Sequence, residues 1–231
     1  MRSILPTALF VLAAFASATA AELPEELAQA CRAALPDAMA KSAAPGATSG
    51  SGVWGRWRIE SGQMDGAGSP EAFLVILPAG RPGEVLFLAE REGKDPVRKK
   101  VSLKGGPVVR ASVAFHPFAE GRALAHVDAD DSGQALLHWN GDKLDTIWKV
   151  GRVRDDERHW FNLDDLDADG VSEVIVFFRR ELDVFTNEDE LAGEGGADDR
   201  TQSRGQIDAV AVHRWHDGRW KKSKDMLESI R

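Results

Sequence analysis

One acidic stretch and the apolar stretch that follows it constrain the fold of this chain more than any other feature. The acidic stretch is Asp165-Leu166-Asp167-Ala168-Asp169-Gly170-Val171-Ser172-Glu173. Carboxylates stand at its positions 1, 3, 5 and 9, and a glycine at position 6 permits the backbone angles of a tight turn. The following residues, 174–178, are β-branched, aliphatic and aromatic, a pattern typical of a buried strand. The sequence therefore predicts an acidic turn that leads directly into a core strand.

Alternate acidic side chains in such a turn can converge on one point. Converging carboxylates repel each other, by about 1 kcal/mol per pair at 4 Å even in water. A hard cation removes that cost, and carboxylate oxygens at flexible distances suit Ca²⁺ better than Mg²⁺ or Zn²⁺. The candidate metal ligands are the side chains of Asp165, Asp167, Asp169 and Glu173. The alternative is a solvated Asp-rich turn without a metal, since such turns are common between strands.

The stretch begins like an EF-hand loop, but Val176 stands where an EF-hand places its bidentate Glu, and no amphipathic helix flanks it. The pattern D-x-D-x-D-G-x-x-E before a strand instead resembles the calcium loops of FG-GAP repeats and of the related VCBS repeats. The resemblance covers residues 163–178, and a Glu at position 9 in place of Asp departs from it. It implies a loop between two strands of a β-propeller blade. It also implies a cation held by the four carboxylates and the Val171 carbonyl.

A second acidic stretch precedes the first. When Asp128 is aligned with Asp165, Asp130 falls on Asp167 and Gly133 falls on Gly170. Ser132 and Leu136 replace the acids at positions 5 and 9. We interpret the stretch as a degenerate second copy that has lost most of its metal affinity. Such repetition favours a repeat array, although one pair of Asp-rich turns can also arise by coincidence.

Short apolar runs with Gly and Pro between them fill the chain from Val53 onward, which predicts an antiparallel, mainly β domain. The runs expected to be strands are 53–59, 73–77, 85–89, 97–103, 108–115, 174–178 and 207–215. Asn140-Gly141 and Asp217-Gly218 predict tight hairpins. Together with the two similar acidic stretches, these features favour a fold of propeller-like repeats. The chain suffices for roughly three or four blades, whereas propellers have about 4–8, so an incomplete ring, a small sandwich and closure by association remain open.

The predicted organisation begins with a signal peptide, residues 1–20, in which Arg2 precedes a short apolar run and small residues. A helical segment, 21–45, and a Gly/Ser-rich linker, 46–52, precede the β domain, 53–231. An acidic insertion, 179–206, is expected to be a surface loop. Cys31 is the only cysteine, so no internal disulfide can form; a half-buried helix cysteine and an intermolecular disulfide are the alternatives.

The net charge of −8 argues against binding to nucleic acid or to anionic membranes, which requires basic patches. After the signal peptide, no apolar run is long enough to span a bilayer. The expected partner is therefore an unknown protein or carbohydrate. Trp54, Trp57 and Trp160 are candidates for an exposed recognition surface, although tryptophan is more often a core residue.

No catalytic or cofactor-binding motif stands out. The six histidines lack metal-binding spacing, Ser112 and Ser172 lie outside any G-x-S-x-G turn, and no phosphate-binding glycine loop occurs. The sequence favours a non-enzymatic, calcium-binding β-repeat protein that is periplasmic or secreted and acts as a binding or envelope-associated module. The alternatives are a metal-dependent hydrolase of polysaccharide or phosphoester, and an exported domain with a metal-free turn.

Overall fold

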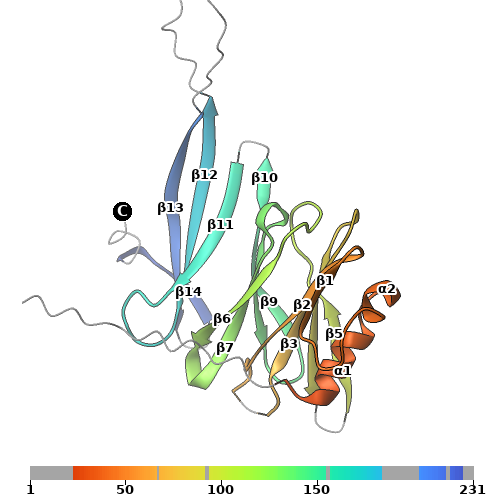
Figure 1. Cartoon of the computed structure of the whole chain (residues 1–231). Helices are drawn as coiled ribbons and strands as arrows, with labels where there is room; N and C mark the ends of the chain where they lie inside the picture. Colours follow the sequence, from red (N-terminus) through yellow and green to blue (C-terminus); the bar gives the residue numbers. More distant parts are fainter. Residues whose placement is uncertain are drawn as a thin grey trace, which may run out of the picture.

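Three antiparallel sheets and two short helices make up the part of the chain that the computed structural model describes (Figure 1). That part comprises residues 23–66, 68–91, 94–154, 157–183, 203–216 and 219–225. The helices are α1 (Glu25–Ala33) and α2 (Asp37–Ala40). The first sheet contains β1 (Ser49–Gly52), β2 (Gly55–Gly62), β3 (Glu71–Pro78), β4 (Glu84–Arg91) and β5 (Lys94–Lys100). The second contains β6 (Ser112–Phe118), β7 (Arg122–Asp128), β8 (Gln134–Trp139) and β9 (Leu144–Val150). The third contains β10 (Arg152–Arg154), β11 (Glu157–Asp164), β12 (Glu173–Asp183), β13 (Ser203–His216) and β14 (Arg219–Ser223).

Every sheet is a meander, in which each strand pairs antiparallel with the next strand along the chain. Each apolar run that was predicted to be a strand overlaps one of these strands. The two predicted hairpins join β8 to β9 and β13 to β14, the second with Trp215 opposite Trp220. The prediction of an antiparallel, mainly β fold is therefore confirmed.

The central strands are buried on both faces, which explains why they are continuously apolar in sequence. In β3, Phe73 and Val75 pack in a core shared with β7 and β8 of the second sheet. Their neighbours Leu74 and Ile76 point to the opposite face, because side chains alternate along a strand, and there they pack against α1. Another core joins the second and third sheets and contains Phe161. The sheets thus follow one another in chain order, with the helices on the outer face of the first (Figure 1).

Helix α1 follows Pro24 and carries acidic residues in its first turn, both favourable at a helix amino end. It buries Leu27 and Cys31 against the first sheet, together with Trp57 from β2. Cys31 is fully buried rather than half-buried, and burial raises the pKa of its thiol to about 12. An intermolecular disulfide through this residue would therefore require α1 to leave the sheet. Trp57 is 4% exposed, so the expectation that it belongs to an exposed recognition surface is wrong.

Two predicted boundaries need correction. Residues 49–52 of the expected linker form the edge strand β1, because small Ser and Gly residues can pair with β2 where Gly50 meets the Trp57 ring. Residues 179–183 and 203–206 of the expected insertion form the paired ends of β12 and β13. Residues 184–202 of the insertion, and residues 1–20 of the expected signal peptide, lie outside the described residues. None of the described helices has the length and apolar character that a membrane crossing requires.

Candidate metal centre

Residues 165–173, here called the Asp165 loop, connect β11 to β12 in the third sheet. Ala168 and Gly170 have positive φ angles of 59° and 86°, so the chain turns sharply at both positions. The Asp165 carboxylate accepts hydrogen bonds from the backbone N–H groups of Asp169 at 3.0 Å and Gly170 at 2.9 Å. Loop acids therefore satisfy backbone donors that no strand partner reaches.

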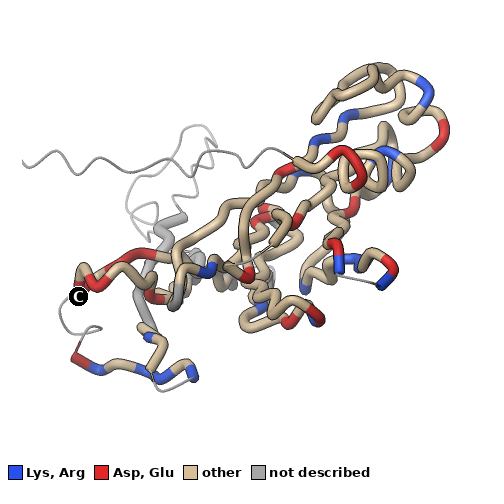
Figure 2. The backbone as a smooth tube through the Cα atoms, turned by 90° about the horizontal axis from the view of Figure 1, so that it is seen from below, with Lys and Arg blue, Asp and Glu red and all other residues tan. Residues whose placement is uncertain are grey.

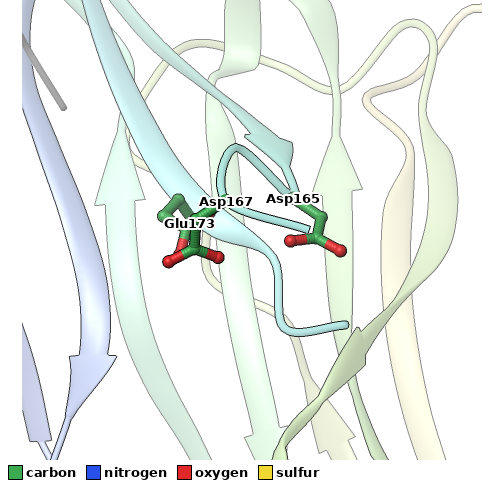
Figure 3. A group of neighbouring side chains, drawn as sticks. All are labelled: Asp165, Asp167 and Glu173. Carbon is green, nitrogen blue, oxygen red and sulfur yellow. The ribbon is translucent and has the colours of Figure 1, made fainter. Parts of the chain in front are cut away.

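Three of the predicted ligands converge. Asp165, Asp167 and Glu173 each present a carboxylate oxygen within 4.8 Å of the other two (Figure 3). Among the described residues, they form the one such group of three or more His, Cys, Asp or Glu side chains. Asp165 and Asp167 are exposed, whereas Glu173 is only 2% exposed at the start of β12. The arrangement offers hard oxygen ligands with an open side toward solvent, which suits a divalent cation such as Ca²⁺.

The electrostatics of the loop disfavour three free carboxylates. Burial raises the pKa of Glu173, and the neighbouring Asp167, Asp169 and Asp165 raise it further. The Leu166 N–H, which donates to Glu173 Oε2 at 2.8 Å, acts in the opposite direction. Within the described part of the chain, no side-chain donor is found on these three carboxylates. A cation would lower the pKa of Glu173 and remove the mutual repulsion.

The other two predicted ligands are placed differently. Asp169 is not a member of the converging group, and its Oδ1 accepts a hydrogen bond from the Val171 N–H at 2.8 Å. The Val171 side chain is partly buried against the core between the second and third sheets. Coordination by Asp169 and by the Val171 carbonyl stays a prediction.

The second acidic stretch lies at the corresponding place in the second sheet, between β7 and β8, but its register differs from the predicted one. We call residues 128–134 the Asp128 loop. Strand β8 begins at Gln134, and Leu136, which was aligned with Glu173, lies inside this strand. The loop is shorter than the Asp165 loop because a 3-10 turn at residues 130–132 replaces part of it. Gly133, with a φ of 93°, is required because a Cβ there would lie 2.3 Å from the Val150 carbonyl oxygen.

A neutral carboxamide occupies the strand start of the Asp128 loop. Gln134 is 5% exposed; its Nε2 donates to Asp128 Oδ2 at 2.8 Å, and its Oε1 accepts from the Phe161 N–H at 2.8 Å. Asp128 Oδ1 accepts from the Asp130 N–H at 3.0 Å. The Asp128 carboxylate is therefore compensated by donors within the protein.

The nearest structural counterpart of the Asp165 loop is one that sequence reasoning missed. Residues 63–71, here called the Gln63 loop, connect β2 to β3, and β3 begins with a buried Glu71 as β12 begins with Glu173. Glu71 Oε2 accepts from the Met64 N–H at 2.7 Å, seven residues earlier, as Glu173 does from Leu166. Gly66 and Gly68 both have a φ of 77°, at the positions of Ala168 and Gly170.

The two loops differ in the side chain that neighbours their shared aspartate position, Asp65 or Asp167. In the Gln63 loop, Gln63 Nε2 donates to Asp65 Oδ1 at 2.8 Å, whereas Asp165 and Asp167 stand at these positions in the Asp165 loop. The signal in the sequence was the Gly-x-Gly-x-x-Glu spacing of residues 66–71, which is too general to stand out. The Gln63 loop also lacks two acids of the Asp165 loop, because Gln63 and Ala67 stand at the first and fifth positions.

Comparisons of the chain with protein-family models, with curated proteins and with solved structures found no match.

Proposed function

We propose that this chain is an exported, non-enzymatic binding or envelope-associated module of propeller-like β repeats, in which the Asp165 loop holds Ca²⁺. The cation would fix the entry of β12, a core strand of the third sheet. The observation that carries the proposal is a contrast among the three loops. A carboxamide donates to the acid in the Gln63 and Asp128 loops, whereas three carboxylates converge in the Asp165 loop without a described side-chain donor.

The choice of Ca²⁺ rests on ligand chemistry. The converging group offers carboxylate oxygens, which hard cations prefer, and offers neither the histidine nor the cysteine that zinc sites use. The exposed side of the group leaves room for water and carbonyl ligands, which suits the six to eight ligands that Ca²⁺ takes. The resemblance of residues 163–178 to FG-GAP and VCBS calcium loops points to the same ion.

Successive meander sheets support the propeller-like part of the proposal. Each sheet has four or five strands, and each of the three loops joins the second strand of its sheet to the third. A propeller typically has about 4–8 such blades, so three described sheets would form an open array. The helices on the outer face of the first sheet would then close one end of the array.

A hydrolase that uses the acidic loop would need an adjoining substrate cavity. Two well-formed cavities among the described residues lie between β2, β3 and residues 107–111, and no residue of the Asp165 loop lines either of them. This separation favours a structural role for the cation over a catalytic one.

Calorimetric titration of the mature chain, residues 21–231, with CaCl₂ tests the proposed cation site. We expect one binding event per chain in the wild type and none in Asp167→Asn, a variant that removes a ligand charge without removing a hydrogen bond to the backbone. Asp65→Asn, the matched change in the Gln63 loop, should leave binding intact. A wild type that binds no Ca²⁺ would contradict the proposal.

Export requires a separate test. Amino-terminal sequencing of protein isolated from the native host should find a chain that begins at Ala21 or Glu22. Recovery of a chain that still carries Met1 would exclude cleavage of the predicted signal peptide.

A further inference from the structure

Four arginines surround a concave surface beside the first sheet, and all of them are distant in sequence from the Asp165 loop. A cavity of about 230 Å³ is lined by Arg56, Arg58 and Arg110 with apolar residues between them. A second cavity, of about 420 Å³, shares Arg56 and Leu77 with the first and continues past Arg81. We call the two adjoining cavities the arginine cleft. In a chain with a net charge of −8, such a local concentration of positive charge is unexpected.

The strand register explains why two of these arginines face the cleft together. Arg56 and Arg58 lie two residues apart on β2, so their side chains project from the same face of the sheet. Their partners on β3 are Leu77 opposite Arg56 and Val75 opposite Arg58. The cleft floor is thus a set of apolar side chains flanked by guanidinium groups.

The opposite wall is held in place by the segment that joins the first and second sheets. Val108 forms a β-bridge with Gly83, whose N–H donates to the Val108 carbonyl at 2.7 Å. A Cβ at Gly83 would lie 2.9 Å from that carbonyl oxygen, so glycine is needed for this close approach. Arg58 Nη2 also donates to the Ala111 carbonyl at 2.6 Å. Backbone pairing and the Arg58 side chain therefore hold residues 108–111 against the first sheet.

Positive charge remains in the cleft after internal ion pairs are considered. Arg58 contacts Glu60 at 2.9 Å, and Arg110 lies 3.7 Å from Asp130 of the Asp128 loop. Within the described ranges, neither Arg56 nor Arg81 makes a hydrogen bond or an ion pair, and both side chains are exposed. Two guanidinium groups are therefore available to an incoming ligand.

Exposed apolar residues lie in the cleft and next to its residues along the chain. Val53, Trp54 and Val109 are the large apolar residues that stand out as exposed in the described part of the chain, at 84%, 59% and 63%. Val109 lines the second cavity. The Trp54 carbonyl accepts from the Ala79 N–H at 3.0 Å, and Ala79 lies between two residues that line this cavity, Pro78 and Gly80. Of the three tryptophans expected to form a recognition surface, Trp54 is strongly exposed and stands two residues before Arg56 in the sequence.

We propose that the arginine cleft binds a small organic oxyanion, a carboxylate or phosphate group carried on a sugar or similar body. Guanidinium groups match carboxylate and phosphate in a planar, two-pronged geometry. The Pro and Val side chains that line the second cavity would cover the body of the ligand. A cleft of this volume suits a ligand of modest size. The overall negative charge opposes the alternatives of an anionic membrane and nucleic acid.

Figure 2 agrees with a local site, because Lys and Arg occupy several separate places along the chain with Asp and Glu between them. The proposal goes beyond the calcium site and does not depend on it, since the cleft contains no residue of the Asp165 loop.

Amide chemical-shift mapping on the ¹⁵N-labelled mature chain tests the proposal. The probes are trigalacturonate as a carboxylate source, glucose 6-phosphate as a phosphate source, and maltotriose as a neutral match. We expect at least one anionic probe to shift amides of residues 56–58, 79–81 and 108–111, and maltotriose to leave them unchanged. Raising the salt concentration should weaken the binding, because the side chains involved are exposed.

A double variant and a matched control distinguish anion binding in the cleft from non-specific attraction to positive charge. Arg56→Gln with Arg81→Gln should weaken the bound anionic probe by at least about tenfold, because each lost guanidinium removes charge-assisted hydrogen bonds. Arg98→Gln, an exposed arginine on β5 away from the cleft, should not change the affinity. Asp167→Asn should lose Ca²⁺ and keep the anion, so failure of one proposal is distinguishable from failure of the other.

Four results would overturn the proposal. The first is no binding of either anionic probe at about 10 mM, a concentration that would detect even weak complexes. The second is equal binding of maltotriose, and the third is equal affinity of the double variant. The fourth is binding only to phosphatidylglycerol vesicles, which would assign the cleft to a membrane surface instead.

Discussion

The Gln63 and Asp165 loops share two positive-φ positions and one hydrogen bond, but they differ in the side chains that surround their acids. Both join the second strand of a sheet to the third, and both fold back on a buried Glu that accepts an N–H from seven residues earlier. In the first loop a carboxamide donates to the nearby aspartate. In the second, aspartates take both positions and three carboxylates lie within 4.8 Å of one another. The two loops differ in a few side chains, and these side chains bring three carboxylates together in the Asp165 loop.

The largest expected change in stability comes from the binding of Ca²⁺ to the Asp165 loop. A cation that binds only the folded chain adds about 2.7 kcal/mol to the free energy of unfolding at a hundredfold excess over its dissociation constant. Thermal melts of the wild type should therefore shift upward from chelator to millimolar Ca²⁺. Asp167→Asn should abolish this shift and Asp65→Asn should preserve it. Identical wild-type curves under the two conditions would favour the solvated turn, and a shift lost only in Asp65→Asn would mean that the wrong loop was chosen.

The second effect concerns the buried Glu71 of the Gln63 loop. Burial and the nearby Asp65 raise the pKa of Glu71 from 4.5 to about 7, against the opposing hydrogen bond from Met64. The folded state therefore holds this proton more tightly than the unfolded state does. Its contribution to stability is present below pH 4.5 and is lost as the pH rises through about 7.

Glu71→Gln should remove this pH dependence, because a glutamine can still accept the Met64 N–H and has no charge to bury. A pKa rise of this size is worth at most about 3 kcal/mol, and local relaxation should reduce the gain at pH 8 to about 2 kcal/mol. Denaturant melts of both proteins at pH 5 and pH 8 measure the difference. The comparison with the variant is needed because His126, whose pKa is lowered to about 4 by burial, titrates with the opposite effect on stability. Equal stability at pH 8 would show that Glu71 is charged there at little cost.

A third, smaller effect tests the carboxamide that compensates the Asp128 loop. Gln134→Ala removes the acceptor of the Phe161 N–H and the donor to Asp128. Because these groups are left unpaired near the core, the free energy of unfolding should fall by about 1.5 kcal/mol. Gln29→Ala, on the exposed face of α1, serves as the control and should change stability little. A loss no larger than that of the control would mean that water replaces the carboxamide at no cost.

The smallest effect is expected at Asp169, the predicted ligand that lies outside the converging group. Asp169→Ala removes an exposed hydrogen bond to the Val171 N–H, worth about 0.5 kcal/mol without metal. Calcium binding measured by calorimetry should weaken less than in Asp167→Asn. If Asp169→Ala abolishes binding as completely, the loop must close around the ion with four carboxylates.

The sequence by itself determined the local features of this protein. Apolar runs such as 73–77 predicted core strands because burial on both faces requires continuous apolar side chains. The Asp-Gly spacing at 165–173 predicted the turn and three of the converging carboxylates, since short acidic side chains satisfy nearby backbone donors wherever such a turn forms.

Only the tertiary structure decided what depends on residues far apart in the chain. Trp57 is buried because α1 lies over it, and Ser49–Gly52 is a strand because β2 offers it a partner. The likeness of the Gln63 and Asp165 loops is a likeness of φ angles and of one hydrogen bond, which three identical residues among nine could not reveal. The arginine cleft combines residues from β2, from the turn after β3 and from the segment before β6. Packing of sheets brings these residues together, and no local pattern encodes that packing.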